Sequence, residues 1–508
     1  MKKEPLWREA GTAPLPKNSL PQERDVVVIG GGITGLTAAV LLKRSGKRVC
    51  VLEKSRVGSG ETGHTSAHLT CLTDLRPVEL IRNFGEEAAR LAWQAGAAAI
   101  DLIEQLVEDL NIDCGFRRVP GFLHAALRGT EDESTSLREE ADAAAKLGFA
   151  ARYVPSTPVL GKPGVGFADQ AIFWPTSYLN ALAAEIQGDG SLVCEEAEVT
   201  EVGDRPTSVA VGDHRITCDE VVVATHVPLM GKSGLVSATL FQTKLYPYST
   251  YIVGAHLPKG TIPHGLYNDT SDPYYYLRVH PDGDRDYAIF GGEDHKTGQA
   301  DNEEERYARL TDAFHKIFPG IPVDRRWSGQ VIETNDGLPY IGRTAERQFV
   351  GTGYAGNGLT FGTIAGLMAH DAVLNRPNPW QKLFDPSRKK VRGGLWDYLV
   401  ENMDYPRYLV SGWLKPSQIR SADQLSMGEG AVLSENGKQV ACSCDEHGHV
   451  TKVSAICTHM GCIVRWNKAE KTWDCPCHGS RFLANGEVIG GPAETPLEAI
   501  ETPAESHA

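Results

Sequence analysis

The chain has 508 residues, of which 41% are hydrophobic, and a formal net charge of −14 at pH 7. This length predicts two to four domains with sizeable cores, and the acidic balance disfavours nucleic acid and anionic membranes as partners. The sequence has no apolar run of about 18 residues or more and no apolar signal core in residues 1–24, so we expect no transmembrane segment and a cytoplasmic location.

The first predicted unit is a strand, a glycine-rich turn, a helix and a second strand. Residues 25–29 read DVVVI, an Ala/Leu-rich helix extends to about Arg44, and residues 48–53 read RVCVLE. This order is typical of the opening of an α/β nucleotide-binding domain. Composition and spacing then predict helices over 86–109 and 131–148 and a buried strand over 219–225.

The amino-acid pattern of the sequence changes after residue 240. Tyr, Thr, Val and Pro alternate between 240 and 295, which predicts an antiparallel sheet facing a substrate. Residues 348–375 return to strand, glycine turn and helix, and short strands and turns begin at about 417. We therefore expect an N-terminal extension (1–23), a large α/β domain (24–375, with its substrate part mainly in 240–325), a surface-packed linker (376–416) and a small all-β domain (417–508).

The glycine turn after the first strand carries the sequence Gly30-Gly31-Gly32-Ile33-Thr34-Gly35. It fits G-x-G-x-x-G between a strand and a helix, and Glu53 ends the next strand. Gly30 allows a tight turn, Gly32 lets the backbone approach a pyrophosphate, and Gly35 lets the helix pack on the strand. Glu53 can accept hydrogen bonds from a ribose, so the unit predicts a dinucleotide site.

Two further glycine-rich stretches bear on the cofactor. The stretch GSGETGHTSA (58–67) has small and hydroxyl residues that can pass a long cofactor and bind phosphate oxygens. The stretch GTGYAG (351–356) also fits G-x-G-x-x-G, but no strand with a terminal acidic residue follows it. We therefore expect no second dinucleotide site there.

From about residue 24 to 375 the sequence resembles the D-amino-acid oxidase, glycine oxidase and sarcosine oxidase group of FAD enzymes. The resemblance is carried by the glycine turn with Glu53, by residues 58–67, by DEVVVATH (219–226), and by WSGQVIETNDGLPYIG (327–342) leading into VGTGYAGNGLT (350–360). It implies a Rossmann-like FAD domain with an antiparallel substrate domain. The residues it assigns to FAD binding are Gly30, Gly32, Gly35, Glu53, Lys54, Thr62, His64, Thr65, Ala224, Thr225, Asp336, Gly337, Gly353, Gly356, Gly358, Leu359 and Thr360.

The same resemblance gives roles to the last block and to one histidine. Gly353, Gly356 and Gly358 precede a helix whose N-terminus would face the flavin pyrimidine ring and stabilise the anionic reduced flavin. Some relatives hold flavin covalently on a histidine after a similar stretch. The sequence around His64 departs from their W-H-A-A-G pattern, so non-covalent binding is favoured while covalent attachment stays open.

Members of this group oxidise amines or amino acids at the carbon beside nitrogen and hold the substrate carboxylate with Arg or Tyr. The resemblance therefore suggests Tyr276, Arg278 and His295 as catalytic or substrate-binding residues, with Tyr274, Tyr275 and Lys296 as further candidates. The alternative is that the tyrosines are core residues and Arg278 only forms an ion pair. The sequence has no nucleophile triad, as expected where the flavin carries the chemistry.

Six of the eleven cysteines lie between Cys442 and Cys477. Four of them belong to C-x-H-x-x-C (457–462) and C-x-C-H (475–478), a local Cys/His cluster that indicates a metal site. Zinc could take four such ligands, but C-x-H is too tight for the usual zinc spacings, and zinc leaves Cys462 and Cys477 unexplained. Cys442 and Cys444 lie outside the motif and are interpreted as plain thiols.

The motif resembles the Rieske [2Fe–2S] signature over about 417–500. The resemblance implies that Cys457 and Cys475 bind one iron and His459 and His478 the other, with Cys462 and Cys477 paired in a disulfide. The stretch Gly490-Gly491-Pro492-Ala493 resembles the proline loop over the cluster. Ser480 is present as a donor to the cluster sulfurs, but Phe482 stands where high-potential relatives have Tyr, so we expect an intermediate potential.

Together these observations predict an FAD-dependent dehydrogenase fused to a Rieske domain. A small amine or amino-acid-like substrate would reduce FAD, the cluster would take single electrons, and an external protein or quinone would accept them. One alternative is an electron-transfer module that works between protein partners without a small-molecule substrate. Another is a redox sensor, and the sheet at 240–295 favours the enzyme.

Overall fold

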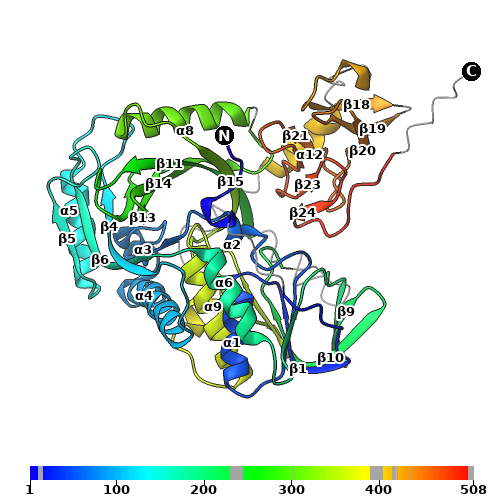
Figure 1. Cartoon of the computed structure of the whole chain (residues 1–508), viewed down its shortest axis with the longest axis horizontal. Helices are drawn as coiled ribbons and strands as arrows, with labels where there is room; N and C mark the ends of the chain where they lie inside the picture. The colour runs from blue at the N-terminus through cyan, green and yellow to red at the C-terminus, as the bar shows by residue number, and fades with distance from the viewer. Residues whose placement is uncertain are drawn as a thin grey trace, which may run out of the picture.

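The computed structural model describes residues 1–9, 15–228, 244–300, 302–388, 404–414, 419, 421–435 and 437–500. These residues form two large sheets with their helices and a smaller C-terminal lobe that carries two short sheets (Figure 1). The predicted fold class, an α/β flavin domain with an antiparallel substrate sheet and an all-β C-terminal domain, is confirmed.

The first sheet has eight strands, of which β17, β10, β1, β2 and the edge strand β7 run parallel. The near-continuous apolar runs of β1 and β2 are buried on both faces, as parallel strands between layers require. Helices α1, α9 and α6 lie together along this sheet (Figure 1). The strands in spatial order are β16 (Tyr340–Ala345), β17 (Gln348–Thr352), β10 (His214–Val223), β1 (Glu23–Ile29), β2 (Val49–Leu52) and β7 (Leu192–Cys194), with β9 (Thr207–Val211) and β8 (Glu201–Asp204) attached to β10.

The second sheet has nine strands and is mostly antiparallel. It is not confined to 240–325, because segments between 68 and 172 supply four of its strands. Long-range pairing of β4 with β12 brings the two parts together, and nothing in the local sequence marks it. The strands in order are β15 (Arg325–Thr334), β11 (Leu245–Pro258), β14 (Arg285–Lys296), β13 (Tyr276–Asp282), β12 (Gly265–Asp269), β4 (Arg117–His124), β6 (Gly164–Ile172) and β3 (His68–Leu69), with β5 (Ala151–Val154) beside β6.

The helices confirm the sequence-based expectations closely. The predicted helices at 86–109 and 131–148 are α4 (Glu86–Asp109) and α5 (Ser134–Lys146). Two helices, α10 and α12, fall in the predicted linker, of which residues 389–403 lie outside the described part. The bounds of α10 and α12 are Gln381–Phe384 and Asp404–Leu414. The other helices are α1 (Ile33–Arg44), α2 (Glu61–His64), α3 (Pro77–Phe84), α6 (Pro175–Ile186), α8 (Glu303–Ile317) and α9 (Gly358–Val373).

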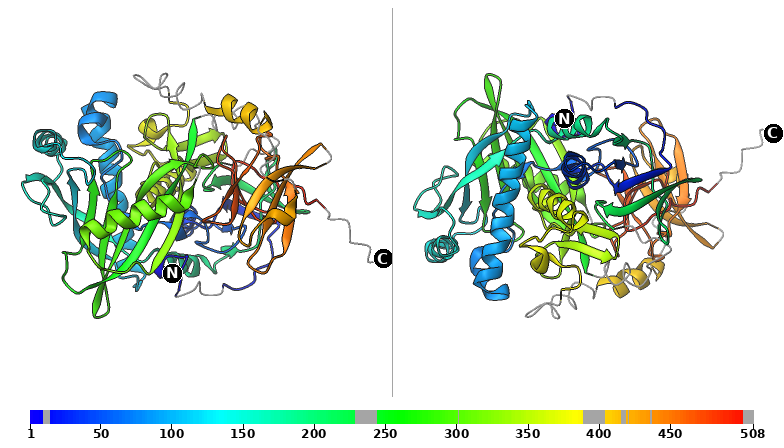
Figure 2. Two further views of the ribbon diagram at one scale, coloured as in Figure 1. Left: turned by 90° about the horizontal axis from the view of Figure 1, so that it is seen from above. Right: turned by 90° about the horizontal axis from the view of Figure 1, so that it is seen from below.

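The C-terminal lobe is built from two small antiparallel sheets. One contains β18 (Gly430–Glu435), β19 (Lys438–Cys444) and β20 (Val450–Ser454), and the other contains β21 (Arg465–Asn467), β22 (Thr472–Asp474), β23 (Arg481–Leu483) and β24 (Val488–Gly490). This lobe lies against the end of the second sheet near β15, as the further views also show (Figure 2). In the described part of the chain, no helix has the length and apolar character needed to cross a membrane.

Candidate flavin site and metal centre

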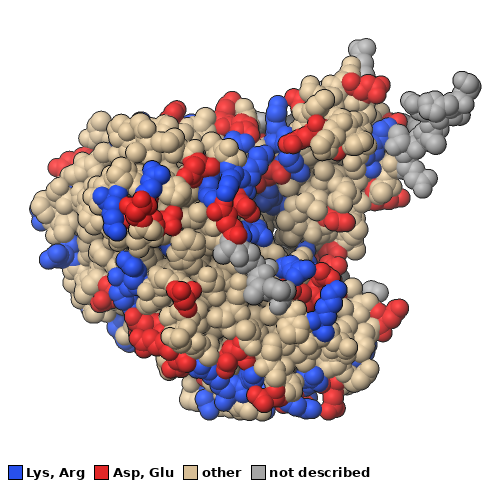
Figure 3. Space-filling model, in the orientation of Figure 1, with Lys and Arg blue, Asp and Glu red and all other residues tan. Residues whose placement is uncertain are grey.

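A large cavity of about 1090 Å³ lies where the two large sheets and the C-terminal lobe meet. Its wall includes the carboxyl ends of β1 and β10, the glycine turn, strands β11, β13 and β15, and residues 483–495 of the C-terminal lobe. The space-filling view shows a hollow in the surface between the C-terminal lobe and the part of the molecule that contains the first sheet (Figure 3). Ligands bind at the carboxyl ends of parallel strands, and this volume exceeds the range of about 300–1,000 Å³ that drug-sized ligands need.

The glycine turn forms a backbone cradle at one end of the cavity. Gly30 has φ +110°, and a Cβ there would lie 2.8 Å from the Ala224 carbonyl oxygen. Gly32, the N-cap of α1, has no side chain, and the Ile33 N–H donates to the Thr62 hydroxyl at 3.3 Å. The N-terminus of the helix lines the cavity, where its other N–H groups can bind phosphate. The Glu53 carboxylate accepts hydrogen bonds from the amides of Gly31 (2.7 Å) and Ser55 (2.8 Å), while burial raises the pKa of Glu53.

Most residues assigned to FAD from the sequence line this cavity. They are Gly30, Gly32, Glu53, Lys54, Thr62, His64, Thr65, Ala224, Thr225, Gly353, Gly356, Gly358 and Leu359. The second glycine motif, which includes Gly353 and Gly356, thus faces the same cavity. A long cavity with a backbone phosphate cradle and a ribose-binding carboxylate fits FAD.

Four of the assigned residues are not among those lining the cavity: Gly35, Asp336, Gly337 and Thr360. Gly35 packs α1 on the turn, because a Cβ there would lie 2.0 Å from the Gly30 carbonyl oxygen. The buried Asp336 carboxylate binds the Arg388 guanidinium at 2.6 and 2.9 Å. Gly337 packs on Leu75, and the Thr360 hydroxyl donates to the Asn357 carbonyl. In this structure these four residues support the residues that line the cavity and do not line it themselves.

His64 lines the cavity, and both of its ring nitrogens contact protein groups. Nδ1 lies 3.1 Å from the Gly60 carbonyl oxygen, and Nε2 lies 2.7 Å from a guanidinium nitrogen of Arg8. Trp7, fully buried, donates its indole N–H to the Gly63 carbonyl at 3.0 Å. The N-terminal segment therefore supports α2, a role that its sequence did not suggest, and the engaged ring favours non-covalent binding at His64.

The structure separates the three residues suggested for substrate chemistry. Tyr276 lines the cavity and its hydroxyl lies 2.9 Å from the Thr250 hydroxyl. The Arg278 guanidinium is buried and donates to the carbonyls of Ala67 (2.8 Å) and Phe173 (2.7 Å), away from the cavity wall. His295 stacks on Tyr251, and burial lowers the pKa of His295 to about 3. The positions of Arg278 and His295 do not support a direct role with substrate.

Two residues that the sequence did not single out, Asp74 and Asp294, line this end of the cavity. The predicted candidates Tyr274 and Tyr276 line it with them, and the Tyr274 hydroxyl donates to the Asp74 carboxylate at 3.0 Å. A Cβ on Gly356 would lie 3.0 Å from an Asp74 oxygen, so this group lies against the turn that begins α9. The predicted candidate Tyr275 instead binds Glu293 at 2.7 Å, outside the cavity wall.

The four expected iron ligands meet between two loops of the C-terminal lobe. The His459 and His478 rings lie edge to face with centroids 4.7 Å apart. Burial lowers the pKa of His459 to about 4 and that of His478 to about 3, so both rings are neutral, as metal ligands must be. The Cys457 and Cys475 thiols hydrogen-bond each other, which lowers the pKa of Cys457. Two adjacent sulfurs beside two adjacent imidazoles fit a Rieske cluster.

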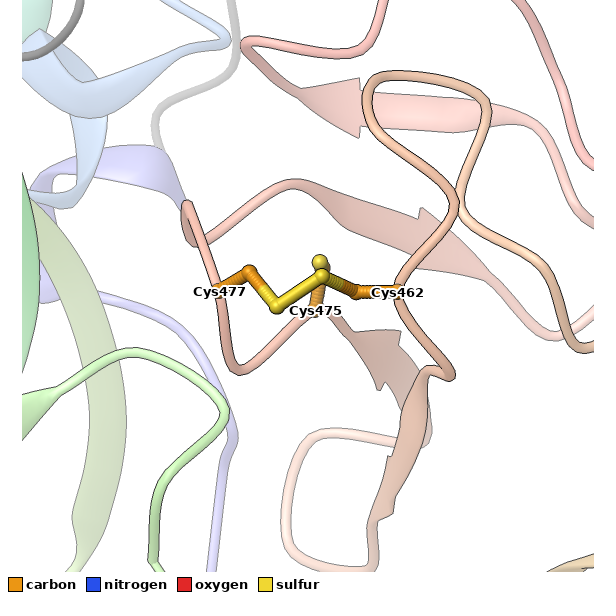
Figure 4. Close-up of side chains that lie close together, drawn as sticks. All are labelled: Cys462, Cys475 and Cys477. Atoms are coloured by element: carbon orange, nitrogen blue, oxygen red, sulfur yellow. A yellow bond between two sulfur atoms is a disulfide. The ribbon is translucent and has the colours of Figure 1, made fainter. Parts of the chain in front are cut away.

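The remaining two cysteines of the motif form a disulfide. Cys462 and Cys477 are bonded, with Cα atoms 6.5 Å apart, and Cys475 lies beside them (Figure 4). The sulfurs of these three cysteines lie within 4.8 Å of one another, but a disulfide cannot supply thiolate ligands. The bridge ties the two ligand loops together, which zinc binding alone would not explain.

Hydrogen bonds to the ligand sulfurs give a prediction about the cluster potential. The Ser480 hydroxyl bonds the Cys457 thiol and also accepts the Ala493 amide at 2.9 Å. Phe482 is fully buried in the same cluster of side chains. We expect Phe482→Tyr to raise the midpoint potential and Ser480→Ala to lower it, within the range of about −150 to +300 mV that Rieske centres span. Redox titration by EPR measures both, Phe482→Leu is the control, and an unchanged midpoint in Phe482→Tyr contradicts the assignment.

Comparisons with known proteins agree with this geometry. The family model for FAD dependent oxidoreductases matches residues 25–372, and that for the Rieske [2Fe-2S] domain matches residues 415–501. The Bacillus subtilis (strain 168) protein YhfW, named as a Rieske 2Fe-2S iron-sulfur protein, is 34% identical over 506 residues, covering 98% of this chain and 97% of its own length.

Two further matches concern the larger domain. Gamma-glutamylputrescine oxidoreductase of Escherichia coli (strain K12) is 26% identical over 365 residues, which cover 67% of this chain and 82% of that protein. The structure of glycine oxidase from Geobacillus kaustophilus superposes with a TM-score of 0.60 at 19% identity, covering 73% of this chain and 100% of that one. The structural match shows the fold.

Proposed function

Because the chain belongs to the FAD dependent oxidoreductase family and carries a C-terminal Rieske [2Fe-2S] domain, we propose that it oxidises a small amine or amino-acid-like substrate and delivers the electrons through the cluster to an external acceptor. Bound flavin accepts two electrons from an organic substrate, whereas the cluster carries one electron at a time. The proposal therefore depends on how closely the flavin cavity and the cluster loops are joined.

The observation that carries the proposal is a wall shared by the two sites. Residues 488–495, here called the covering loop, line the flavin cavity along their whole length. The same loop holds the cluster loops, since the Ala493 amide donates to the Ser480 hydroxyl and the Thr458 hydroxyl donates to the Thr495 carbonyl at 2.7 Å. The covering loop therefore contacts both the cavity and the segments that bear the proposed iron ligands, which favours electron transfer between the two sites.

A second contact joins the sheet of the flavin domain to a ligand loop. Gln330, on β15 and in the cavity wall, donates its side-chain N–H to the Gly479 carbonyl at 2.9 Å and to the Thr297 hydroxyl at 3.2 Å. Gly479 directly follows the iron ligand His478. Gln330 therefore holds the histidine side of the cluster against the flavin cavity.

The packing around this contact is close. A Cβ on Gly298 would lie 2.8 Å from the backbone of the ligand Cys475, and a Cβ on Gly479 would lie 2.2 Å from Pro247. The Gln299 side chain also donates to the Pro476 carbonyl at 2.9 Å. Direct backbone packing of this kind is expected of a fixed interface, which keeps the distance between the cofactors short.

The experiment that tests the proposal is anaerobic reduction with a panel of amines and amino acids, followed by flavin absorbance and by EPR of the cluster. Bleaching of the flavin together with the EPR signal of the reduced cluster supports the proposal. If no compound bleaches the flavin while chemical reductants reduce both cofactors, the protein is instead an electron carrier between partners.

The variant Gln330→Met tests the hydrogen bond between Gln330 and the Gly479 carbonyl. Methionine has similar length but cannot donate to Gly479, so we expect electron transfer from flavin to cluster to slow by about 10-fold, as for other residues that support metal ligands. Stopped-flow absorbance after light-driven reduction of the flavin measures the rate. Gln439→Met, on β19 away from this interface, should leave the rate unchanged; equal rates in the Gln330 variant and the wild type would contradict the role.

A further inference from the structure

The end of the cavity beside α9 is acidic. Asp74 and Asp294 both line it, with Tyr274 and Tyr276 between them on β13 and the turn before it. The Asp74 side chain is exposed and lines the cavity, and one oxygen of the Asp294 carboxylate, Oδ1, is buried with no hydrogen-bond partner among the described residues. A buried acceptor without a partner is costly unless a ligand satisfies it.

No positively charged side chain balances these carboxylates from within the cavity wall. Across the described residues that line the cavity, Lys54 is the sole Lys or Arg, and its ammonium donates to the Val488 carbonyl in the covering loop. Burial lowers the pKa of His68 to about 3 and also lowers that of His226, so neither ring carries charge at neutral pH.

The arginines near Asp294 and Asp74 do not line the cavity. Arg306 donates to the backbone carbonyls of Glu293 and Asp294 and lies outside the wall, as does Arg278. Burial raises the pKa of Asp74 to about 7 and that of Asp294 to about 6. The Asp294 carboxylate adds to the rise for Asp74, while a Thr250 hydrogen bond and the charge of Arg306 offset part of the rise for Asp294. A cation placed between them would relieve both the burial cost and the mutual repulsion.

We infer that the substrate is an amine that carries no carboxylate on the carbon to be oxidised, and that Asp74 and Asp294 bind its ammonium group beside the start of α9. This inference rests on the proposed function and narrows its substrate class. An α-amino acid would have to place its own carboxylate in the same pocket as the two aspartates, where the described wall offers no Arg and only Lys54, whose ammonium donates to the Val488 carbonyl.

The same arrangement suits the proton transfer that amine oxidation requires. The ammonium R–CH2–NH3⁺ gives one proton to an aspartate oxygen, and its carbon then gives a hydride, two electrons and a proton, to the flavin. The product is the iminium ion R–CH=NH2⁺, which adds water to yield an aldehyde and ammonium. A carboxylate whose pKa is raised towards neutrality is a suitable proton acceptor for this step.

The test uses matched pairs of amine and amino acid that differ by one carboxylate: cadaverine and lysine, agmatine and arginine, and phenethylamine and phenylalanine. The holoprotein is mixed anaerobically with each compound, and flavin bleaching is followed. We expect at least one amine to bleach the flavin with kcat/KM at least about 100-fold above that of its amino acid, a difference of the size expected when a site leaves a charged group unpaired.

The outcomes separate the inference from the function on which it rests. Bleaching by amino acids in preference to their amines overturns the inference and leaves the proposed oxidation intact. Bleaching by no compound, in protein whose flavin and cluster are reduced by dithionite, overturns both.

Two variants and a binding measurement locate the site. We expect Asp74→Asn and Asp294→Asn each to raise KM for the active amine by about 10-fold or more, the size of loss seen when one partner of a buried charge pair is removed. Benzylamine should perturb the flavin spectrum of the wild type and benzoate should not, and the variants should lose the response to benzylamine. Asp142→Asn, on the exposed face of α5, is the control. Unchanged KM and an unchanged benzylamine response in both variants would overturn the assignment.

Discussion

Replacing Cys457 by alanine is expected to remove the iron–sulfur cluster while the flavin stays bound. Cys457 is 1% exposed and hydrogen-bonds the Cys475 thiol, and we assign it as one of the two sulfur ligands of the same iron. The glycine cradle for FAD belongs to a separate sheet and does not depend on this residue. Iron content should fall from about two per chain to near zero, and turnover with an external one-electron acceptor should be lost.

The matched control is Cys442→Ala. Cys442 is as buried as Cys457 and lies in the same lobe, but on β19 and outside the ligand motif. We expect this variant to keep its iron and its EPR signal. If Cys442→Ala loses the cluster and Cys457→Ala retains it, the ligand assignment is wrong.

Gly35→Ala should abolish tight FAD binding. A Cβ at this position would lie 2.0 Å from the Gly30 carbonyl oxygen and 3.1 Å from Val28, so α1 must move away from the turn that cradles the pyrophosphate. Alanine favours a helix by about 1 kcal/mol over glycine, but overpacking of this kind costs about 1–3 kcal/mol. The net loss of up to about 2 kcal/mol corresponds to up to about 30-fold weaker FAD binding, which titration of the apoprotein with FAD measures.

Gly166→Ala is the control for this substitution. Gly166 lies on β6 in the second sheet, and a Cβ there would meet Phe122 at an ordinary 3.5 Å. We expect its stability to stay within about 0.5 kcal/mol of the wild type, with unchanged FAD affinity. Equal FAD affinity in Gly35→Ala and Gly166→Ala would show that the close approach of α1 to the turn does not matter.

Features set by neighbours in the chain could be predicted from the sequence. The phosphate cradle needs only Gly30, Gly32 and Gly35 at fixed spacing, and each iron-ligand pair lies within one short loop. In each case the chemistry and the local backbone are specified by the same few residues. The strand and helix order around them follows from apolar runs and from amphipathic spacing.

The substrate end of the cavity could not be predicted in the same way. Asp294 faces the cavity because β14 contains a bulge, in which Glu293 has φ +62° and two residues oppose Thr250. A bulge reverses the alternation of side chains along a strand, so the strand pattern alone does not favour Asp294 over His295 as the residue that faces the cavity. Asp74 and Tyr274 meet across 200 positions of the chain, a contact that only the assembled sheet creates.

Arg278 illustrates the opposite case, a residue whose type suggested substrate binding. A guanidinium on a strand of the substrate sheet is a natural ligand for a carboxylate. Its three acceptors, however, are the carbonyls of Ser66, Ala67 and Phe173, which come from two distant segments of the chain. Arg278 therefore fixes the segment after α2 in place.

The central claim is that electrons pass from the flavin to the cluster within one molecule. The most direct measurement is anaerobic light-driven reduction of the flavin, followed in time by the EPR signal of the cluster at several protein concentrations. We predict that the cluster becomes reduced with a first-order rate that does not change with concentration. A cluster that stays oxidised beside reduced flavin, or one reduced at a rate proportional to protein concentration, would contradict the account.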